Sequence, residues 1–333
     1  MSLGLAAALK LDEAGEVAKI AERMRELLRS HLHRRGLVVA ISGGIDSSVC
    51  AALAVRAVGR ERVFGLLLPE RDSASDSSIR GRKVVGQLGI HYEECDIAPV
   101  LDALGCYRWR DAAIRAVFPA YADGWKNKIV IAGGQTGHFN FFKLVVQSPD
   151  GQIFEERLDS KNYLQIVAAT NFKQRVRKTL EYFHADRLHY AVVGTPNRLE
   201  YDQGFFVKNG DGSADLKPIA HLYKTQVYAL AEYLGFPEEI CNVQPTTDTY
   251  SMTQGQDEFY FALPYGEMDI ALLAYNSGEP ATALAMELGF SVEQAELIYR
   301  DIEAKRRTTA MLHWPAIPVE AVIGPNTKPP TPV

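Results

Sequence analysis

The sequence has few cysteines, and none of them stands in a CxxC pair. The four are Cys50, Cys95, Cys106 and Cys241. Because they are scattered, they predict free thiols and give no indication of a zinc knuckle or a dithiol redox site. There are eight histidines, of which His31 and His33 lie on a charged helical segment and His184 and His189 straddle a helix end, so they do not favour a histidine metal site.

Long hydrophobic runs and an excess of positive charge are also missing. No run approaches the roughly 18 to 20 apolar residues of a membrane-spanning helix, and the first residues lack the pattern of a signal peptide. Lys and Arg total 36 against 41 Asp and Glu, which gives a formal charge of −5 and no general attraction to nucleic acid or anionic membranes. We therefore expect a cytoplasmic protein that binds neither, and any anionic ligand must be held by local features.

Short apolar runs rich in β-branched residues alternate with amphipathic helical segments. The runs at 37–41, 63–69 and 189–194 have the composition of buried strands, and HYEECD at 91–96 predicts another strand. Strands that alternate with helices imply right-handed crossovers and a parallel sheet. The sequence predicts an α/β fold with a Rossmann-like, doubly wound parallel sheet.

The pattern changes in the middle of the chain and again near its end. From Asp123 to Asp159 three strand-like segments follow one another, and the last two flank a Pro-Asp-Gly turn at 149–151. We assign a β-rich insertion at about 106–160, a helical C-terminal part, and a proline-rich tail at 311–333. The remaining residues predict a single domain over 1–310 that contains the insertion.

A glycine turn follows the first buried strand and opens a helix. Its sequence, SGGIDSS, occupies residues 42–48. Glycines let the backbone approach an anion closely, and converging amides with the helix dipole favour negative charge at a helix start. A capped helix N-terminus is the structural alternative. We interpret the turn as a phosphate site whose residues are Ser42, Gly43, Gly44, Asp46, Ser47 and Ser48.

Asp46 is unexpected in a phosphate site, because a carboxylate repels phosphate unless a divalent cation lies between them. Mg²⁺ prefers carboxylate and phosphate oxygens, so Asp46 is a candidate magnesium ligand. The turn lacks the Gly-Lys-Ser/Thr ending of a Walker motif, and no GxGxxG follows a strand. It closely resembles the signature of the ATP pyrophosphatase class, whose fold is adenine nucleotide alpha hydrolase-like and which cleaves ATP between the α and β phosphates.

A second set of polar residues follows the strand at 189–194. Ligands bind at the carboxyl ends of parallel strands, so the loop that follows this strand should face the phosphate turn. Glu200 can supply a second carboxylate to the magnesium, while Lys208 and Lys224 can neutralise phosphates. Taken singly, each of these side chains is typical of a solvated loop.

Taken together, these segments resemble ammonia-dependent NAD synthetase over about residues 37–307, apart from the insertion. NFKQRVR at 171–177 and PTTD at 245–248 match at the expected spacing. The resemblance implies that ATP contacts the phosphate turn together with Thr195, Lys224 and Thr246, and that Asp46 and Glu200 bind magnesium. It also implies that the dinucleotide contacts Arg175, Lys208, Asp215 and Lys305.

The reaction implied by this resemblance is the ATP-dependent amidation of deamido-NAD with ammonia. The nicotinate carboxylate attacks the α phosphorus, pyrophosphate leaves, and ammonia displaces AMP from the adenylated carboxylate. Positioning and electrostatics can carry such steps without a protein nucleophile. The resemblance also implies a homodimer.

The sequence departs from the family pattern at three places. Near the C-terminus the family carries a His-Lys pair, where this chain has Ala304 and Lys305. The insertion is an addition that can serve as a lid, a dimer contact, a docking surface for an ammonia donor or plain packing. The segment PERDS at 69–73 is more similar to family members with a fused glutaminase. Because no glutaminase fits in this chain, we expect ammonia to be free or to come from a separate protein.

Two alternative functions remain open at this point. One is an amide or thio-transfer enzyme of the same class that acts on another carboxylate or on tRNA, although the tRNA version predicts a basic face and paired cysteines. The other is a non-catalytic ATP-binding module. The presence of Asp46, Glu200, Lys208 and Lys224 disfavours the latter.

Overall fold

A parallel four-stranded sheet forms the centre of the computed structural model, which describes residues 4–74, 76–132, 141–243, 249–252, 255, 260 and 263–320. The strands run in the order β3-β2-β1-β7. Their bounds are β1 (Leu37–Ala40), β2 (Val63–Leu67), β3 (His91–Glu94) and β7 (Ala191–Val193). All three pairings are parallel. The predicted strands and the predicted Rossmann-like α/β fold are therefore confirmed.

Helices cover both faces of this sheet, because successive strand residues point to opposite sides. Leu37 and Val39 pack into one hydrophobic core, and Val38 packs into the other. The first core includes residues of α2 (Glu13–Leu27), α3 (Ile45–Val58), α4 (Ser77–Leu88), α9 (Lys224–Tyr233) and α10 (Glu238–Cys241). The second includes residues of α5 (Ala98–Ala103), α6 (Cys106–Val117) and α7 (Ser160–Leu188). The sheet is doubly wound, as predicted.

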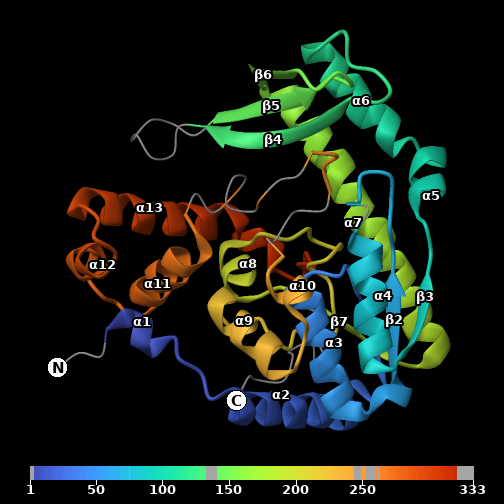
Figure 1. Ribbon diagram of the computed structural model, residues 1–333, viewed down its shortest axis with the longest axis vertical. Helices are drawn as coiled ribbons and strands as arrows, with labels where there is room; N and C mark the ends of the chain where they lie inside the picture. The colour runs from blue at the N-terminus through green and yellow to red at the C-terminus, as the bar shows by residue number, and fades with distance from the viewer. Residues whose placement is uncertain are drawn as a thin grey trace.

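A second, antiparallel sheet lies at one end of the long helix α7 (Figure 1). Its strands run in the order β4-β5-β6, with bounds β4 (Lys126–Ala132), β5 (Phe141–Gln147) and β6 (Ile153–Arg157). This sheet confirms the strands expected between 123 and 159. The first part of the predicted β-rich insertion differs, because Cys106–Val117 forms helix α6. Ile114 of α6 and Ile166 of α7 pack in one core with Ile129, Leu144 and Val146 of the sheet.

The C-terminal part is helical, as expected. It comprises α11 (Tyr265–Asn276), α12 (Ala281–Leu288), α13 (Val292–Thr309) and the short η4 (Ala310–Leu312). The beginning of the predicted tail is thus still helical, and residues 321–333 lie outside the described part. The remaining short elements are α1 (Leu5–Ala8), η1 (Leu28–Leu32), η2 (Arg60–Arg62) and α8 (Arg198–Gln203).

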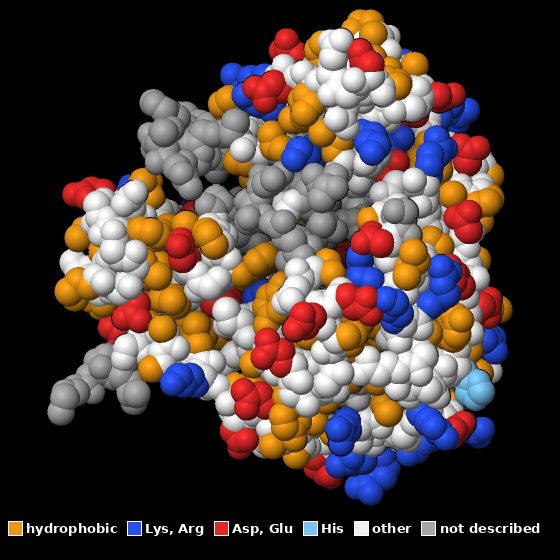
Figure 2. Space-filling view, viewed as in Figure 1, with side chains coloured by type: hydrophobic (Ala, Val, Ile, Leu, Met, Phe, Trp, Pro, Cys, Tyr) orange, Lys and Arg blue, Asp and Glu red, His pale blue; other side chains and the backbone are white. Residues whose placement is uncertain are grey.

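Charges of both signs are interspersed over the face seen in Figure 2, with a group of Lys and Arg side chains along its lower edge. Within the described residues, none of the helices combines the length and the apolar character needed to cross a bilayer.

The packing of the antiparallel sheet onto α6 and α7 predicts that it contributes to global stability. Ile129 is 0% exposed, whereas Ile153 on the same sheet is 62% exposed. We expect Ile129→Ala to lower the free energy of unfolding by about 2–5 kcal/mol and Ile153→Ala to change it by less than about 1 kcal/mol. Chemical denaturation of both variants measures this. Equally small effects would mean that the sheet folds separately from the core.

Candidate active site

The phosphate turn joins the end of β1 to the start of α3, at the carboxyl edge of the parallel sheet. Gly43 has a φ of +79°, and a Cβ at this position would lie 2.6 Å from the carbonyl oxygen of Ser77. The hydroxyls of Ser47 and Ser48 donate to the carbonyl oxygen of Gly44, at 2.9 and 2.8 Å. The Ser42 hydroxyl accepts from the amide of Gly44 at 3.2 Å. The serines therefore hold the turn in shape, and only glycine fits at 43.

The two predicted magnesium carboxylates are held together by Asn197. Its side-chain amide donates to Asp46 Oδ1 at 3.2 Å, and its backbone amide donates to Glu200 Oε2 at 3.1 Å. The Asn197 oxygen also accepts from the amides of Leu199 and Glu200, so the residue caps α8 through a capping box. The start of α8 thus places Glu200 beside Asp46.

Lys224 is the cation next to these carboxylates. Its side chain is fully buried, and its ammonium is paired with Asp46. Burial lowers the pKa of Lys224, but the charges of Asp46 and Glu200 outweigh this effect and raise it above its ordinary value. The lysine is therefore charged in the folded protein.

Asp269 of α11 supports Lys224 from behind. Its carboxylate accepts from the backbone amides of Lys224 at 3.1 Å and Thr225 at 2.7 Å, at the start of α9. Burial raises the pKa of Asp269 to about 6, although these hydrogen bonds oppose the shift. The C-terminal helices thus fix the beginning of α9 and, with it, the position of the buried lysine.

A cavity of about 680 Å³ opens over the turn. The predicted residues that line it are Ser42, Gly44, Asp46, Ser47, Arg175, Thr195, Glu200, Lys208 and Lys305. Its volume lies in the range of small-molecule sites. Gly43, Ser48 and Lys224 lie behind this lining, where they support it.

One predicted contact does not line the cavity, and another is not among the described residues. Asp215 does not line the cavity, and its carboxylate accepts from the amide of Val192 at 2.7 Å and the hydroxyl of Tyr182 at 3.4 Å. In this structure the Asp215 carboxylate is therefore bonded to the middle residue of β7. Thr246 lies outside the described residues.

Three of the predicted cations that line the cavity come from separate elements. Arg175 of α7 donates to the carbonyl oxygen of Lys208 at 3.3 Å, and the Lys208 ammonium donates to that of Met311 at 2.8 Å. Lys305 of α13 is paired with Asp301 at 2.6 Å, and burial lowers its pKa although Asp301 opposes the shift. Side chains from α7, the loop after α8, and α13 thus meet around one space.

Two further residues of the site were not expected from the sequence. Arg80 of α4 lines the cavity and lies 3.4 Å from the carbonyl oxygen of Gly43, a second cation at the turn. The sequence signal was the arginine in the first helical turns after the serine-rich loop that follows β2. Asn197 lies in the polar loop that follows the strand at 189–194, and its spacing to Glu200 is that of a capping box.

A second, smaller cavity of about 200 Å³ adjoins the first. It lies at the carboxyl ends of β1, β2 and β7, against Ile41, Leu67 and Val193. Both cavities include Ser42, Ser47 and Thr195 in their linings. The phosphate turn is therefore shared between two adjoining spaces.

Comparison with known proteins identifies the family. The family model for NAD synthase matches residues 16–116 and 142–309. The chain belongs to the NAD synthase family. It is 56% identical to the NH(3)-dependent NAD(+) synthetase of Rhizobium meliloti (strain 1021), over 92% of this chain and 91% of the relative. It is 35% identical to the NH(3)-dependent NAD(+) synthetase of Thermotoga neapolitana, over 85% and 91%.

The fold of the family is seen in solved structures as well. The structure of the NH3-dependent NAD synthetase from Campylobacter jejuni superposes on this chain with a TM-score of 0.62 and 20% sequence identity. The superposition covers 93% of this chain and 100% of the Campylobacter jejuni chain. The NAD synthase family model leaves residues 117–141 unmatched, and these include β4. The antiparallel sheet is thus partly outside the sequence that this chain shares with the family.

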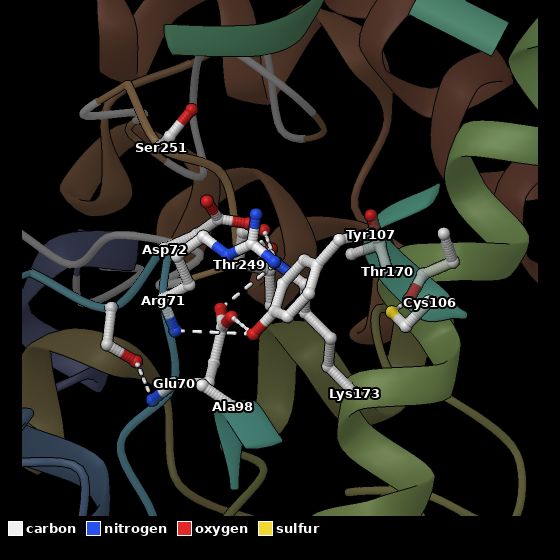
Figure 3. Close-up of polar contacts among 12 residues, drawn as sticks. Glu70, Arg71, Asp72, Ala98, Cys106, Tyr107, Thr170, Lys173, Thr249 and Ser251 are labelled. Atoms are coloured by element: carbon white, nitrogen blue, oxygen red, sulfur yellow. Dashed lines mark hydrogen bonds and ion pairs between the residues drawn. The ribbon is translucent and has the colours of Figure 1, made fainter. Parts of the chain in front are cut away.

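A buried charge cluster lies beside the site, in the segment at 69–73 (Figure 3). The Lys173 ammonium of α7 contacts Glu70 at 3.0 Å, Asp72 at 2.5 Å and the carbonyl oxygen of Thr249 at 2.9 Å. The Tyr107 hydroxyl of α6 donates to Glu70 at 2.8 Å. Lys173 on α7 therefore connects the loop after β2 to the backbone at Thr249. Through the bond from Tyr107 to Glu70, helix α6 belongs to the same cluster.

The cluster contains a second cation, which pairs with the same loop. Arg110 of α6 is buried and forms an ion pair with Asp72. Burial raises the pKa of the Asp72 carboxyl, but the charges of Lys173 and Arg110 outweigh burial and hold it below its ordinary value. Asp72 thus contributes stability above the pKa of its unfolded form, and this stability is lost as the pH falls through its folded pKa.

Loss of Lys173 should leave two buried carboxylates with insufficient positive charge. We expect Lys173→Met to lower the free energy of unfolding at pH 7 by about 3–5 kcal/mol. The deficit should shrink as the pH falls toward 4, because burial then raises the carboxyl pKa values in the variant and protonation removes the unpaired charge. Denaturation curves at several pH values measure this.

Lys143→Met is the matched control, since Lys143 pairs with Glu155 at 2.8 Å on the surface. A surface pair contributes at most about 1 kcal/mol, so this variant should differ little from the unaltered chain at any of these pH values. A Lys173→Met deficit that is independent of pH would contradict the charge argument.

Proposed function

We propose that this chain amidates the nicotinate carboxylate of deamido-NAD with ammonia and converts ATP to AMP and pyrophosphate. The observation that carries the proposal is the phosphate turn shared by two cavities, because an ATP-dependent ligase must bring two nucleotides to one point. The NH(3)-dependent NAD(+) synthetases to which the chain is similar support the choice of substrates.

The turn suits a pyrophosphate leaving group. A carboxylate is a poor acyl donor until its oxygen is attached to a good leaving group, so the nicotinate oxygen attacks the α phosphorus and the β and γ phosphates depart together. Amides at the start of α3 and Arg80 favour the negative charge that develops on them. Ammonia then attacks the carbonyl carbon of the adenylated carboxylate, AMP leaves, and the ammonia nitrogen loses its extra proton to give the amide.

The acidic pair fits a magnesium ion. Asp46 and Glu200 both line the large cavity, and among the described residues no group of three or more His, Cys, Asp or Glu side chains is placed to hold a metal alone. Two carboxylates with phosphate oxygens as further ligands is the arrangement that Mg²⁺ prefers. The bound ion would neutralise phosphate charge, while Lys224 and Asn197 hold Asp46 in place.

The ATP nucleoside is assigned to the smaller cavity. It is lined by Ile41, Leu67 and Val193, at the carboxyl ends of the strands where ligands of open α/β sheets bind. The dinucleotide then occupies the larger cavity, which is lined by Arg175, Lys208 and Lys305, three cations that suit its diphosphate. Asp215 is retained as a proposed dinucleotide contact, and in this structure its carboxylate accepts from the amide of Val192 within β7. Thr246 is retained as a proposed ATP contact.

The proposed partners are deamido-NAD, ATP and ammonia, with the ammonia either free or supplied by a separate protein. A homodimer and a cytoplasmic location are also proposed, from the family resemblance. Sedimentation of the purified chain tests the dimer, since a monomer at micromolar concentration would contradict it.

The proposed reaction predicts three products in equal amounts. Purified chain with ATP, Mg²⁺, ammonium and deamido-NAD should form NAD, AMP and pyrophosphate at equal rates. Asp46→Asn keeps the side-chain volume but removes the charge, so we expect the rate to fall at least about 100-fold. The three products are followed together by chromatography and a pyrophosphate assay.

Glu232→Gln is the control, because Glu232 is an exposed carboxylate on α9 away from the cavity. It should retain full activity. Pyrophosphate release without NAD would assign the chain to a ligase acting on another carboxylate, and a fully active Asp46→Asn variant would remove Asp46 from the site.

A further inference from the structure

The chain continues past the end of the family match and still takes part in the site. The match to the NAD synthase family model ends at residue 309, which is also the last residue of α13. Residues 310–313, called here the C-terminal strap, comprise η4 and His313. Leu312 of the strap lines the larger cavity. The strap therefore forms part of the cavity wall, although the match to the family model does not extend to it.

The strap holds one of the cations proposed for the dinucleotide. The Lys208 ammonium donates to the carbonyl oxygen of Met311 at 2.8 Å. The carbonyl oxygen of Lys208 in turn accepts from Nε of Arg175 at 3.3 Å. Lys208 is thus fixed at its backbone by α7 and at its ammonium by the strap.

His313 attaches the strap to the segment that carries Lys208. Its ring meets the rings of Tyr201 and Phe206 edge-on, with centroids 4.9 and 5.0 Å apart and planes 78° and 80° apart. This T-shaped geometry is a favourable arrangement of aromatic rings. Phe206 lies two residues before Lys208, and His313 lies two residues after Met311. The ring contacts therefore stand directly beside the bond between Lys208 and the strap.

The His313 imidazole is neutral at pH 7. Desolvation lowers the pKa of His313 and the charge of Lys217 lowers it further, although Asp202 opposes the shift. The Lys217 ammonium lies 4.9 Å from the ring centroid of Tyr201 and 5.4 Å from that of Phe206, the two rings that His313 contacts. An uncharged ring suits a place beside this ammonium. His313 thus acts through its ring contacts.

Helix α13 packs against α8 through contacts that precede the strap in the chain. Arg306 of α13 forms two hydrogen bonds with the carboxylate of Asp202, at 2.5 and 2.7 Å. A Cβ at Gly204 would lie 2.3 Å from Cβ of Thr309, so the end of α13 approaches the backbone after α8 closely. The strap is therefore not required to hold α13 in place. Its own contacts go to the loop that carries Lys208.

We propose that the C-terminal strap positions Lys208 for the diphosphate of the dinucleotide, with His313 as the positioning residue that anchors the strap. The inference rests on the proposed function. A lysine side chain loses rotamer freedom when it binds an anion, and a contact that restricts the side chain beforehand reduces that cost. The carbonyl oxygen of Met311 accepts one of the three N–H donors of the ammonium, which leaves two for phosphate oxygens.

Substitution of His313 tests the anchor. For His313→Ala we expect the KM for deamido-NAD to rise by about 3- to 10-fold, which corresponds to the loss of a ring contact. His313→Phe keeps an uncharged ring, so its KM should lie within about twofold of that of the unaltered chain. The KM for ATP and the kcat should stay within about twofold in both variants, because the phosphate turn and the acidic pair are unchanged. Steady-state kinetics with each substrate varied in turn measures the three constants.

A double-mutant cycle separates positioning of Lys208 from general support of the site. In a Lys208→Met background the ammonium that the strap holds is gone. His313→Ala should then cause no further rise in the KM for deamido-NAD, since residues that act through one another are not additive. Titration calorimetry of deamido-NAD without ATP should give the same ratios as dissociation constants.

Trp314→Ala is the matched control. Trp314 is the next ring along the chain, is 51% exposed and does not line the cavity. The substitution removes a larger ring than His313→Ala does, immediately after the strap. It should leave all three kinetic constants unchanged.

The outcomes separate the strap from the function itself. An unchanged KM for deamido-NAD in His313→Ala, with NAD still formed, overturns the positioning role and leaves the proposed reaction intact. A lower KM also overturns it, because the strap would then hold Lys208 away from the ligand. Equal rises in the KM for both nucleotides, or the same effect of His313→Ala with and without Lys208, would mean that the strap supports the site in general. An unaltered chain that binds deamido-NAD but forms no NAD contradicts the proposed reaction alone, and one that does not bind deamido-NAD overturns both.

Discussion

The buried ammonium of Lys173 is the interaction on which the arrangement of the site depends. It lies on α7 and contacts two carboxylates of the loop after β2 as well as the chain at Thr249. A charge in the protein interior is tolerated only when its partners surround it, so these segments cannot move apart without exposing an unpaired ion. Because α7 also carries Arg175 and Tyr163, which both line the large cavity, the same anchor sets the position of this lining relative to the parallel sheet.

This anchor connects two parts of the molecule that differ in their sequence pattern, the α/β part and the strand-rich segment. The parallel sheet holds the phosphate turn, and the antiparallel sheet packs on α6 and the beginning of α7 through Ile129 and Leu144. Tyr107 and Arg110 of α6 take part in the charge cluster, and Ile114 of the same helix takes part in the core below the sheet. Helix α6 thus packs against the antiparallel sheet through Ile114 and contacts the loop after β2 through Tyr107 and Arg110.

The strands, most helices and the phosphate turn were predictable because they depend on local patterns. A buried β-branched run, a glycine turn and an amphipathic helix are each written in consecutive residues. The site beyond the turn was predictable through the family resemblance, which placed Glu200, Arg175 and Lys208 around one space. Arg80 and the entry of Phe142 into the cavity were not, because both depend on how distant segments pack, which no spacing along the chain records.

Asp215 shows that the sequence context of a residue does not determine where its side chain points. Its place in a polar string resembles that of a substrate contact, yet its carboxylate accepts a backbone amide of β7 in this structure. A carboxylate that accepts a backbone amide of a strand and one that contacts a ligand have the same sequence signature. Only the direction of the side chain separates them, and packing sets that direction.

The capping of α8 by Asn197 has a consequence for how the site comes into being. Asp46 is 151 residues from Asn197 and 178 from Lys224 along the chain. A nascent chain that ends at β7 already holds the whole phosphate turn, but it has neither the amide that positions Asp46 nor the lysine that balances its charge. Contacts of such sequence separation form late, after long loops have closed. The acidic pair is therefore held together only once Asn197 and Lys224, which follow β7 in the chain, have packed against the phosphate turn.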